Sequence, residues 1–240
     1  MLQKSNMNLD DLIVIVPARK GSKRIKNKNF KLLNNYPLIE YTFAFIKKYN
    51  KNLTIFFSTD YKISNKYFKK YNLFYHKRSS KLSTSNAKTI DVIKDCLSHI
   101  PYRKKQVILL LQPTNPLRDM KVLLKGLQII QKEKKCDSCS SYIETKFFHP
   151  SKIAMIDKNF KTTQYIKKNS KLIKEKSYVL DGAFYFAKRH IIEKNNSMIG
   201  NNHYGLINNP NIHVNIDNLK DWEIAKILLK KYSRYNFINK

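Results

Sequence analysis

Six cationic side chains lie within the ten residues Arg19–Lys28, with a glycine and a serine among them. The cations are Arg19, Lys20, Lys23, Arg24, Lys26 and Lys28, and the two small residues are Gly21 and Ser22. Guanidinium groups, ammonium groups, a hydroxyl and free backbone amides are the donors that proteins use to hold phosphate. A glycine also permits backbone angles that a residue with a Cβ resists. The stretch therefore predicts a phosphate-binding loop.

An apolar segment, Ile13–Val16, precedes this loop and ends at Pro17. It is short and β-branched, which is typical of a buried strand in a parallel sheet. The loop has neither the GxxxxGK[ST] nor the GxGxxG spacing, which excludes the two commonest phosphate-binding motifs. A solvated basic loop without a ligand is the alternative interpretation.

The order of residues in the loop resembles the signature of sugar-activating cytidylyltransferases. The matching residues are Pro17-Ala18-Arg19-Lys20-Gly21-Ser22-Lys23-Arg24-Ile25, followed by Lys28-Asn29. Two further segments, Gln112–Arg118 and Asn215–Trp222, extend the resemblance to the acylneuraminate cytidylyltransferase family. Members of that family join CTP to a nine-carbon keto sugar acid and release pyrophosphate. The resemblance implies a Rossmann-like fold with a smaller dimerisation arm.

The resemblance also implies roles for individual residues. Arg19, Lys23 and Asp217 are the implied catalytic residues, the first two at the leaving phosphates. The implied nucleotide-binding residues are Arg19, Gly21, Ser22, Lys23, Lys28, Asn29, Ala87 and Thr89, and the implied sugar-binding residues are Gln112, Lys152 and Asp181. Lys152 belongs to an arm motif that reaches the neighbouring subunit's sugar. Arg118 either contacts a ligand or caps the following loop.

A divalent ion, Mg²⁺ or Mn²⁺, is expected because pyrophosphate release requires charge neutralisation. The family pattern places two acidic residues at the metal, whereas this chain has Asn215 and Asp217 there. An amide oxygen can bind Mg²⁺ but contributes less charge, so weaker metal binding is expected. Asp217 as a mere helix cap is the alternative. The cytosine loop, Ser85–Thr89, and Asp181-Gly182-Ala183 also depart from the family pattern.

Composition restricts the partners. The chain has 240 residues, 47 Lys and Arg against 17 Asp and Glu, and a formal charge of +30. This charge favours anionic ligands, but the basic residues are spread along the chain, which makes nucleic acid an unlikely partner. Cys136 and Cys139 form a CxxC pair that is interpreted as two ordinary thiols rather than a redox pair or half a zinc site. Three cysteines and no apolar segment of membrane-spanning length indicate a cytoplasmic protein without a membrane partner.

Hydrophobic periodicity predicts an α/β protein, with a mostly parallel sheet and helices on both faces. We interpret residues 1–240 as a single nucleotidyltransferase domain with an inserted arm at about 146–177. The expected strands are 12–16, 53–58, 73–76, 107–111, 139–144, 178–187 and 211–216, and the expected helices are 38–49, 62–71, 89–100, 120–134, 189–194 and 221–232. In the arm, strand pieces are expected at 152–156 and 164–166, and an Asn-rich loop is expected after residue 194. No Ser/His/Asp or Cys/His set is apparent.

The leading hypothesis is a CTP-dependent enzyme that activates a sialic-acid-like sugar and acts as a homodimer. N-acetylneuraminate and legionaminate fit the family resemblance better than pseudaminate or keto-deoxyoctonate. One alternative is a catalytically lapsed, basic nucleotide- or nucleic-acid-binding protein with the same fold. Another is a nucleotidyltransferase for a sugar phosphate that uses a different nucleoside triphosphate.

Overall fold

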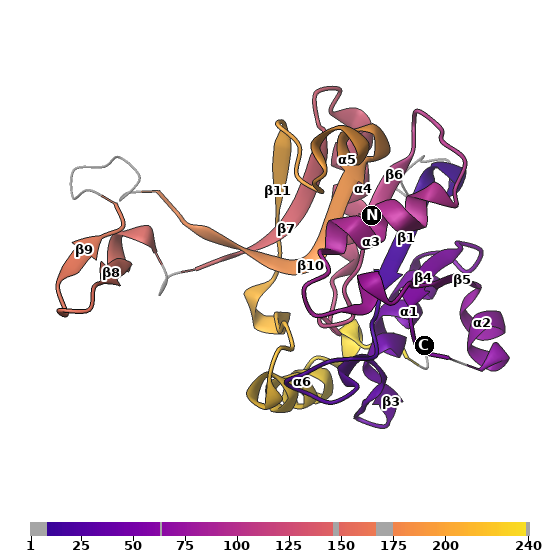
Figure 1. Cartoon of the computed structure of the whole chain (residues 1–240), viewed down its shortest axis with the longest axis horizontal. Coiled ribbons are helices and arrows are strands. Elements are labelled where there is room, and N and C mark those ends of the chain that lie inside the picture. Colours follow the sequence, from indigo (N-terminus) through magenta and orange to yellow (C-terminus); the bar gives the residue numbers. More distant parts are fainter. Residues whose placement is uncertain (1–8, 63, 146–148, 167–174, 239–240) are drawn as a thin grey trace.

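The computed structural model describes residues 9–238 except 63, 146–148 and 167–174. Its centre is a seven-stranded sheet in the order β11-β7-β10-β6-β1-β4-β5 (Figure 1). The strands are β1 Leu12–Pro17, β4 Ile55–Thr59, β5 Leu73–Lys77, β6 Val107–Leu110, β7 Ser138–Glu144, β10 Tyr178–Lys188 and β11 His203–Ile207. Only β10 is antiparallel to its neighbours, β6 and β7. The expected mostly parallel sheet is confirmed.

Six α-helices flank the sheet in the described part of the chain. They are α1 Leu38–Tyr49, α2 Asn65–Tyr71, α3 Thr89–Ser98, α4 Met120–Lys132, α5 Arg189–Asn195 and α6 Leu219–Lys231. Alternate residues of β1 point to opposite faces, as the strand geometry requires. Leu12, Val14 and Val16 pack with buried residues of α1, α4 and α6. Ile13 and Ile15 pack with residues of α3 and α5, so helices cover both faces.

Strands β7 and β10 continue beyond the sheet as a ribbon that leads to a projecting arm (Figure 1). The arm contains a short hairpin of β8 Ala154–Ile156 and β9 Thr162–Gln164. The second strand lies two residues before its expected position, because the chain turns through Phe160 at φ +63°. The arm residues 146–148 and 167–174 lie outside the described residues.

The sequence interpretation after α5 is wrong in two places. Residues 211–216 do not form a strand, and β11 His203–Ile207 lies within the stretch expected to be an Asn-rich loop. Ile212, Val214 and Ile216 are buried in alternation, which imitates a strand, but the segment starts as a short 3₁₀-helix, Pro210–Ile212. β11 shows a weak apolar signal because it is an edge strand and buries only Leu206 among its five residues.

Within the described residues, none of the helices combines the length and the apolar character that crossing a membrane requires.

Candidate active site

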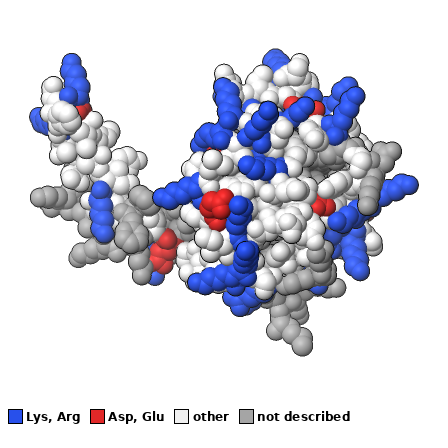
Figure 2. Space-filling view, turned by 90° about the horizontal axis from the view of Figure 1, so that it is seen from below, with Lys and Arg blue, Asp and Glu red and all other residues white. Residues whose placement is uncertain are grey.

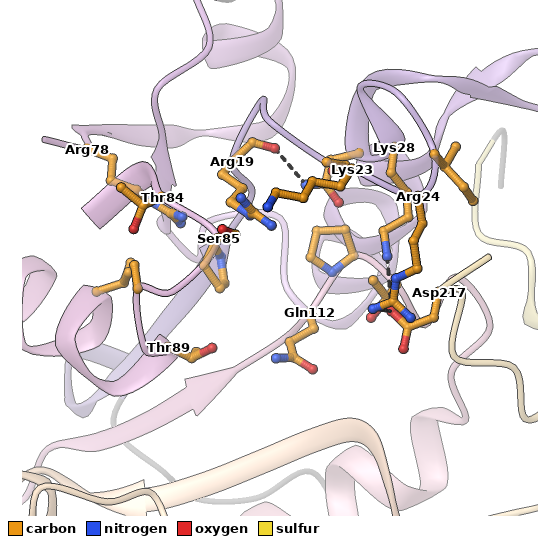
Figure 3. Close-up of a pocket in the computed structure, with 18 of the residues that line it drawn as sticks. Arg19, Lys23, Arg24, Lys28, Arg78, Thr84, Ser85, Thr89, Gln112 and Asp217 are labelled. Atoms are coloured by element: carbon orange, nitrogen blue, oxygen red, sulfur yellow. Dashed lines mark hydrogen bonds and ion pairs between the residues drawn. The ribbon is translucent and has the colours of Figure 1, made fainter. Parts of the chain in front are cut away.

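A cavity of about 550 Å³ lies at the carboxyl ends of β1 and β6 (Figure 3). Four separate stretches of the chain line it, and three of them follow the strands β1, β5 and β6. The polar and cationic lining residues are Arg19, Ser22, Lys23, Arg24, Lys28, Asn29, Arg78, Thr84, Ser85, Thr89, Gln112, Thr114, Asn215 and Asp217. This edge of an open α/β sheet is where ligands bind.

The cavity brings together most residues that the sequence singled out. Arg19, Ser22, Lys23, Lys28, Asn29, Ala87, Thr89, Gln112, Asn215 and Asp217 all line it. Gly21, Lys152 and Asp181 do not. Gly21 is not in the left-handed region, and a Cβ there would meet no atom within 4 Å. The backbone at position 21 therefore does not use the conformational freedom that a glycine permits.

A few hydrogen bonds and one buried side chain hold the basic loop, and four of its six cations, Arg19, Lys23, Arg24 and Lys28, line the cavity. The Asn29 amide donates to the Arg19 carbonyl at 3.0 Å, and the Lys20 N–H donates to an Asp60 oxygen at 2.7 Å. Ile25 is buried beneath the loop. Asn27 adopts φ +53° and starts the 3₁₀-turn Lys28–Phe30. This turn directs Lys28 toward Asp217 (Figure 3).

Lys28 and Arg24 both contact Asp217 across the cavity. The Lys28 Nζ donates to the Ile216 carbonyl at 2.5 Å and lies 3.4 Å from Asp217 Oδ1. Arg24 Nη2 lies 3.5 Å from the same oxygen. Burial lowers the pKa of Lys28, and the Asp217 charge opposes that effect. These contacts connect the basic loop to Asp217, the carboxylate that the family resemblance assigns to the metal.

Asp217 is not the cap of α6. Asn218 caps that helix, and the Asp221 carboxylate accepts from the backbone N–H groups of Asn218 and Asp217, at 3.0 and 2.8 Å. The Asp217 side chain is 48% exposed. Its carboxylate is therefore available to a ligand, and the capping box fixes its backbone.

The residues present fit a metal only if a ligand brings most of the coordination. No group of three or more His, Cys, Asp or Glu side chains that could hold a metal occurs among the described residues. One carboxylate, Asp217, and the neighbouring Asn215 amide face the cavity, and two cations already lie near Asp217. Mg²⁺ commonly binds through one or two carboxylates plus substrate phosphates, and this donor set suits that arrangement.

A buried arginine supports the wall of the cavity at Gln112. Arg118 is fully buried and donates to the carbonyls of Gln112 and Ala183, at 2.5 and 3.1 Å, and to Thr42 Oγ1 at 3.0 Å. Burial lowers the pKa of Arg118 to about 9, and Asp181 opposes the effect. Arg118 therefore connects the loop after β6 to α1 and β10, and it is not among the residues that line the cavity.

Asp181 also has a structural environment. It is buried, and its carboxylate accepts from the Ser141 hydroxyl, the Ala183 N–H at 2.9 Å and the Asn208 amide at 2.7 Å. The adjoining Gly182 adopts φ +78°, where a Cβ would lie 3.6 Å from both Gln112 Oε1 and Asn215 Nδ2. Asp181 thus shapes a bulge of β10 that abuts the cavity, while its own oxygens are occupied by protein donors.

Sequence reasoning missed Arg78 and assigned no role to Arg24, Thr84 or Ser85. Arg78 is 7% exposed, yet it lines the cavity and donates to the Ser58 carbonyl at 3.0 Å. In a chain with 47 Lys and Arg residues, one more arginine gives no compositional signal. The available signal was its position, directly after β5 and at the same sheet edge as the loops that follow β1 and β6.

Two further features of the sequence are its cysteines and its many cations. The three cysteines are buried and free. Figure 2 shows lysines and arginines scattered over one face of the body and on the arm, without a single basic stripe. A continuous basic stripe is what a nucleic-acid track requires.

The comparisons with known proteins bear on the family of the chain. The cytidylyltransferase family model matches residues 13–234. An N-acylneuraminate cytidylyltransferase of Escherichia coli is 27% identical over 93% of this chain and 53% of its own length. The CMP-N,N'-diacetyllegionaminic acid synthase of Legionella pneumophila is 28% identical over 91% of this chain and 96% of its own length. This chain spans about half the length of the first of these relatives.

A solved structure with a similar fold is the CMP:2-keto-3-deoxy-manno-octonic acid synthetase complexed with CTP. Its TM-score is 0.64 at 11% identity, and the match covers 92% of this chain and 98% of that one. At this identity the likeness bears on the fold alone, and it supports the Rossmann-like assignment. The family match, in contrast, extends over almost all of the sequence, and this chain belongs to the cytidylyltransferase family.

Proposed function

We propose that this protein joins CTP to a sialic-acid-like keto sugar acid, of the N-acetylneuraminate or legionaminate type, to give the CMP-sugar and pyrophosphate. The observation that carries the proposal is the single cavity that gathers the Arg19–Asn29 loop, the Thr84–Thr89 wall, Gln112 and Asp217. The names of the relatives in Escherichia coli and Legionella pneumophila support the substrate class.

The reaction is an in-line displacement at phosphorus. A hydroxyl oxygen of the sugar forms a bond to the α-phosphorus of CTP, its proton passes to water, and the bond from that phosphorus to the oxygen that bridges to the β-phosphate breaks. The leaving pyrophosphate takes the electron pair. Arg19 and Lys23 face the cavity from the loop after β1 and would neutralise that charge (Figure 3). Mg²⁺ or Mn²⁺ bound by the phosphates, Asp217 and Asn215 would neutralise charge on the transferred group.

The two ends of the cavity suit different parts of the substrates. Arg78, Thr84, Ser85 and Thr89 lie together on one side of Arg19, and Arg24, Lys28 and Asp217 lie on the other (Figure 3). Hydroxyls and a guanidinium suit a nucleoside, which offers carbonyl, amine and hydroxyl groups. We assign the cytidine to the first side, with Ala87 and Thr89. The sugar is assigned to the wall formed by Gln112 beside Gly182.

Pyrophosphate release from CTP and Mg²⁺ across a panel of keto sugar acids tests the proposal. Release with one sugar is expected, and Arg19→Ala should lower it by at least about 100-fold. Arg234→Ala is the matched control, because that arginine is exposed and outside the cavity lining. No release with any sugar, while CTP still binds, would favour a lapsed nucleotide-binding protein. Release with a sugar phosphate and another nucleoside triphosphate would reassign the substrates.

We also propose a homodimer in which the arm of one subunit reaches the other subunit's cavity. The arm extends away from its own body and carries Lys152 (Figure 1). Its hairpin exposes Met155 and Ile156 by 61% and 66%, and isolated two-stranded hairpins are marginally stable in water. A partner that covers these side chains would stabilise the arm.

Subunit mixing tests this arrangement. Arg19→Ala and Lys152→Ala proteins should each be inactive alone, but a mixed dimer contains one site with both residues intact. An equal mixture, refolded together, should recover about a quarter of the wild-type rate. No recovery, with dimers present by light scattering, would show that Lys152 does not act in the partner's site.

A further inference from the structure

A chain of hydrogen bonds leads from α3 through the interior to the cavity. His76 Nε2 lies 3.1 Å from Asp95 Oδ2, and His76 Nδ1 lies 3.0 Å from Ser58 Oγ. Arg78 Nε lies 3.3 Å from the same hydroxyl. No Ser/His/Asp set is apparent in the sequence, yet the fold brings one together from β4, β5 and α3.

The set is not a nucleophile with its base. Ser58 is completely buried, and its hydroxyl already contacts His76 and Arg78. Nucleophilic serines, in contrast, must meet their substrate. The set ends instead at Arg78, whose guanidinium reaches the cavity (Figure 3).

The positions of the protons follow from the partners. Asp95 accepts from His76 Nε2–H, so the Nδ1 of a neutral imidazole is free to accept from the Ser58 hydroxyl. The Ser58 oxygen in turn accepts from Arg78 Nε–H, and Arg78 Nη2 donates to the Ser58 carbonyl at 3.0 Å. The His76 Nε2–H, the Ser58 hydroxyl and the Arg78 Nε–H all have an acceptor within this chain of contacts when His76 is neutral.

Protonation of His76 would break this order. Its Nδ1 would then donate, and the Ser58 oxygen would face two donors, His76 and Arg78, while its own proton lost its acceptor. A second positive charge would also lie beside Arg78. Burial holds the pKa of His76 below its usual value, with a smaller contribution from Arg78, and the Asp95 charge opposes both.

The other groups near the set are few. From α3, Cys96 Sγ lies 3.5 Å from His76 Nδ1, and the His99 ring lies 5.1 Å from the His76 ring. Burial lowers the pKa of Arg78, and Arg19 adds to that effect, whereas Cys96, Asp60 and Asp95 oppose it. Among the groups near His76, the Ser58 hydroxyl connects the imidazole to the cavity.

We propose that neutral His76 is a positioning residue that, through Ser58, holds Arg78 toward the nucleotide, and that protonation of His76 weakens nucleotide binding. This inference rests on the proposed function, because Arg78 is taken to contact CTP. The sign is fixed by the geometry: affinity is full above the pKa of His76 and falls as the pH drops through it.

Calorimetric titration with CTP between about pH 5 and 8 tests the proposal. At pH 8, His76→Asn and Ser58→Ala should each weaken binding about tenfold, and as the pH falls the wild type should approach the variants. The triphosphate of CTP also changes its protonation with pH. This change affects the wild type and every variant equally, so it cancels in the ratio of wild-type affinity to variant affinity. His190→Asn, at an exposed histidine of α5, should behave as wild type.

A double-mutant cycle separates positioning from general stability. With Arg78→Ala in place, adding His76→Asn should change the affinity less than about twofold. Equal weakening with and without Arg78, or a wild type to His76→Asn ratio that does not vary with pH, would overturn the inference. If His76→Asn does not fold, Ser58→Ala replaces it both in the mutant cycle with Arg78→Ala and in the measurement of the affinity ratio against pH. A wild-type protein that binds no CTP at any pH would refute the proposed function, and this inference with it.

Discussion

Two aspartates near the same end of the cavity have opposite surroundings. Asp181 is 2% exposed, and three protein donors occupy its carboxylate. The Asp217 side chain is 48% exposed and has only the longer contacts to Arg24 and Lys28, at 3.5 and 3.4 Å. The first carboxylate builds the wall and the second is left available. The number of protein donors that use a carboxylate, rather than its place in a motif, therefore indicates its role.

The largest effect is expected for Asp181→Ala. The change leaves the Ser141 hydroxyl, the Ala183 N–H and the Asn208 amide without their acceptor. It also removes the negative charge that favours the charged form of the buried Arg118. The free energy of unfolding should fall by about 3–5 kcal/mol. Urea denaturation measures it. A loss of activity at unchanged stability would instead make Asp181 a substrate ligand, which would contradict the structural role assigned to it.

A smaller effect, confined to catalysis, is expected for Asp217→Ala. The free energy of unfolding should change by no more than about 0.5 kcal/mol, because the Asp217 side chain is 48% exposed and Lys28 keeps its hydrogen bond to the Ile216 carbonyl. The value of kcat/KM for the transfer should fall on the order of 100-fold. Denaturation and pyrophosphate assays on the same preparation measure both quantities. A large loss of stability would show that Asp217 is structural like Asp181.

The smallest effect is expected for Asn215→Asp. A second carboxylate beside Asp217 should lower the Mg²⁺ concentration that gives half-maximal activity, by up to about tenfold. Asn211→Asp adds the same charge at another exposed position of this segment and should leave the Mg²⁺ dependence unchanged. If both variants respond alike, the net charge of the segment, and not coordination, sets the metal requirement.

The sequence singled out the basic loop because its residues occur in a particular order, and the structure places most of the singled-out residues at the cavity. It also predicted most helices and sheet strands, since each buries an apolar face with the expected period. It could not assign Asp181 or Arg78, because their roles depend on partners far along the chain, such as Asn208 and Ser58. Apolar residues alternate along 211–216, and this pattern predicted a strand. Their burial does alternate, but the segment pairs with none of the described strands.

The contact between Lys28 and the Ile216 carbonyl has a consequence for synthesis of the protein. The two residues are 188 positions apart, so a ribosome adding about 5–20 residues per second needs roughly 10–40 s to make the second after the first. Throughout that interval the nascent loop carries its six cations without the segment that later anchors it. The cavity is therefore assembled late in translation, after most of the sheet is already available to fold.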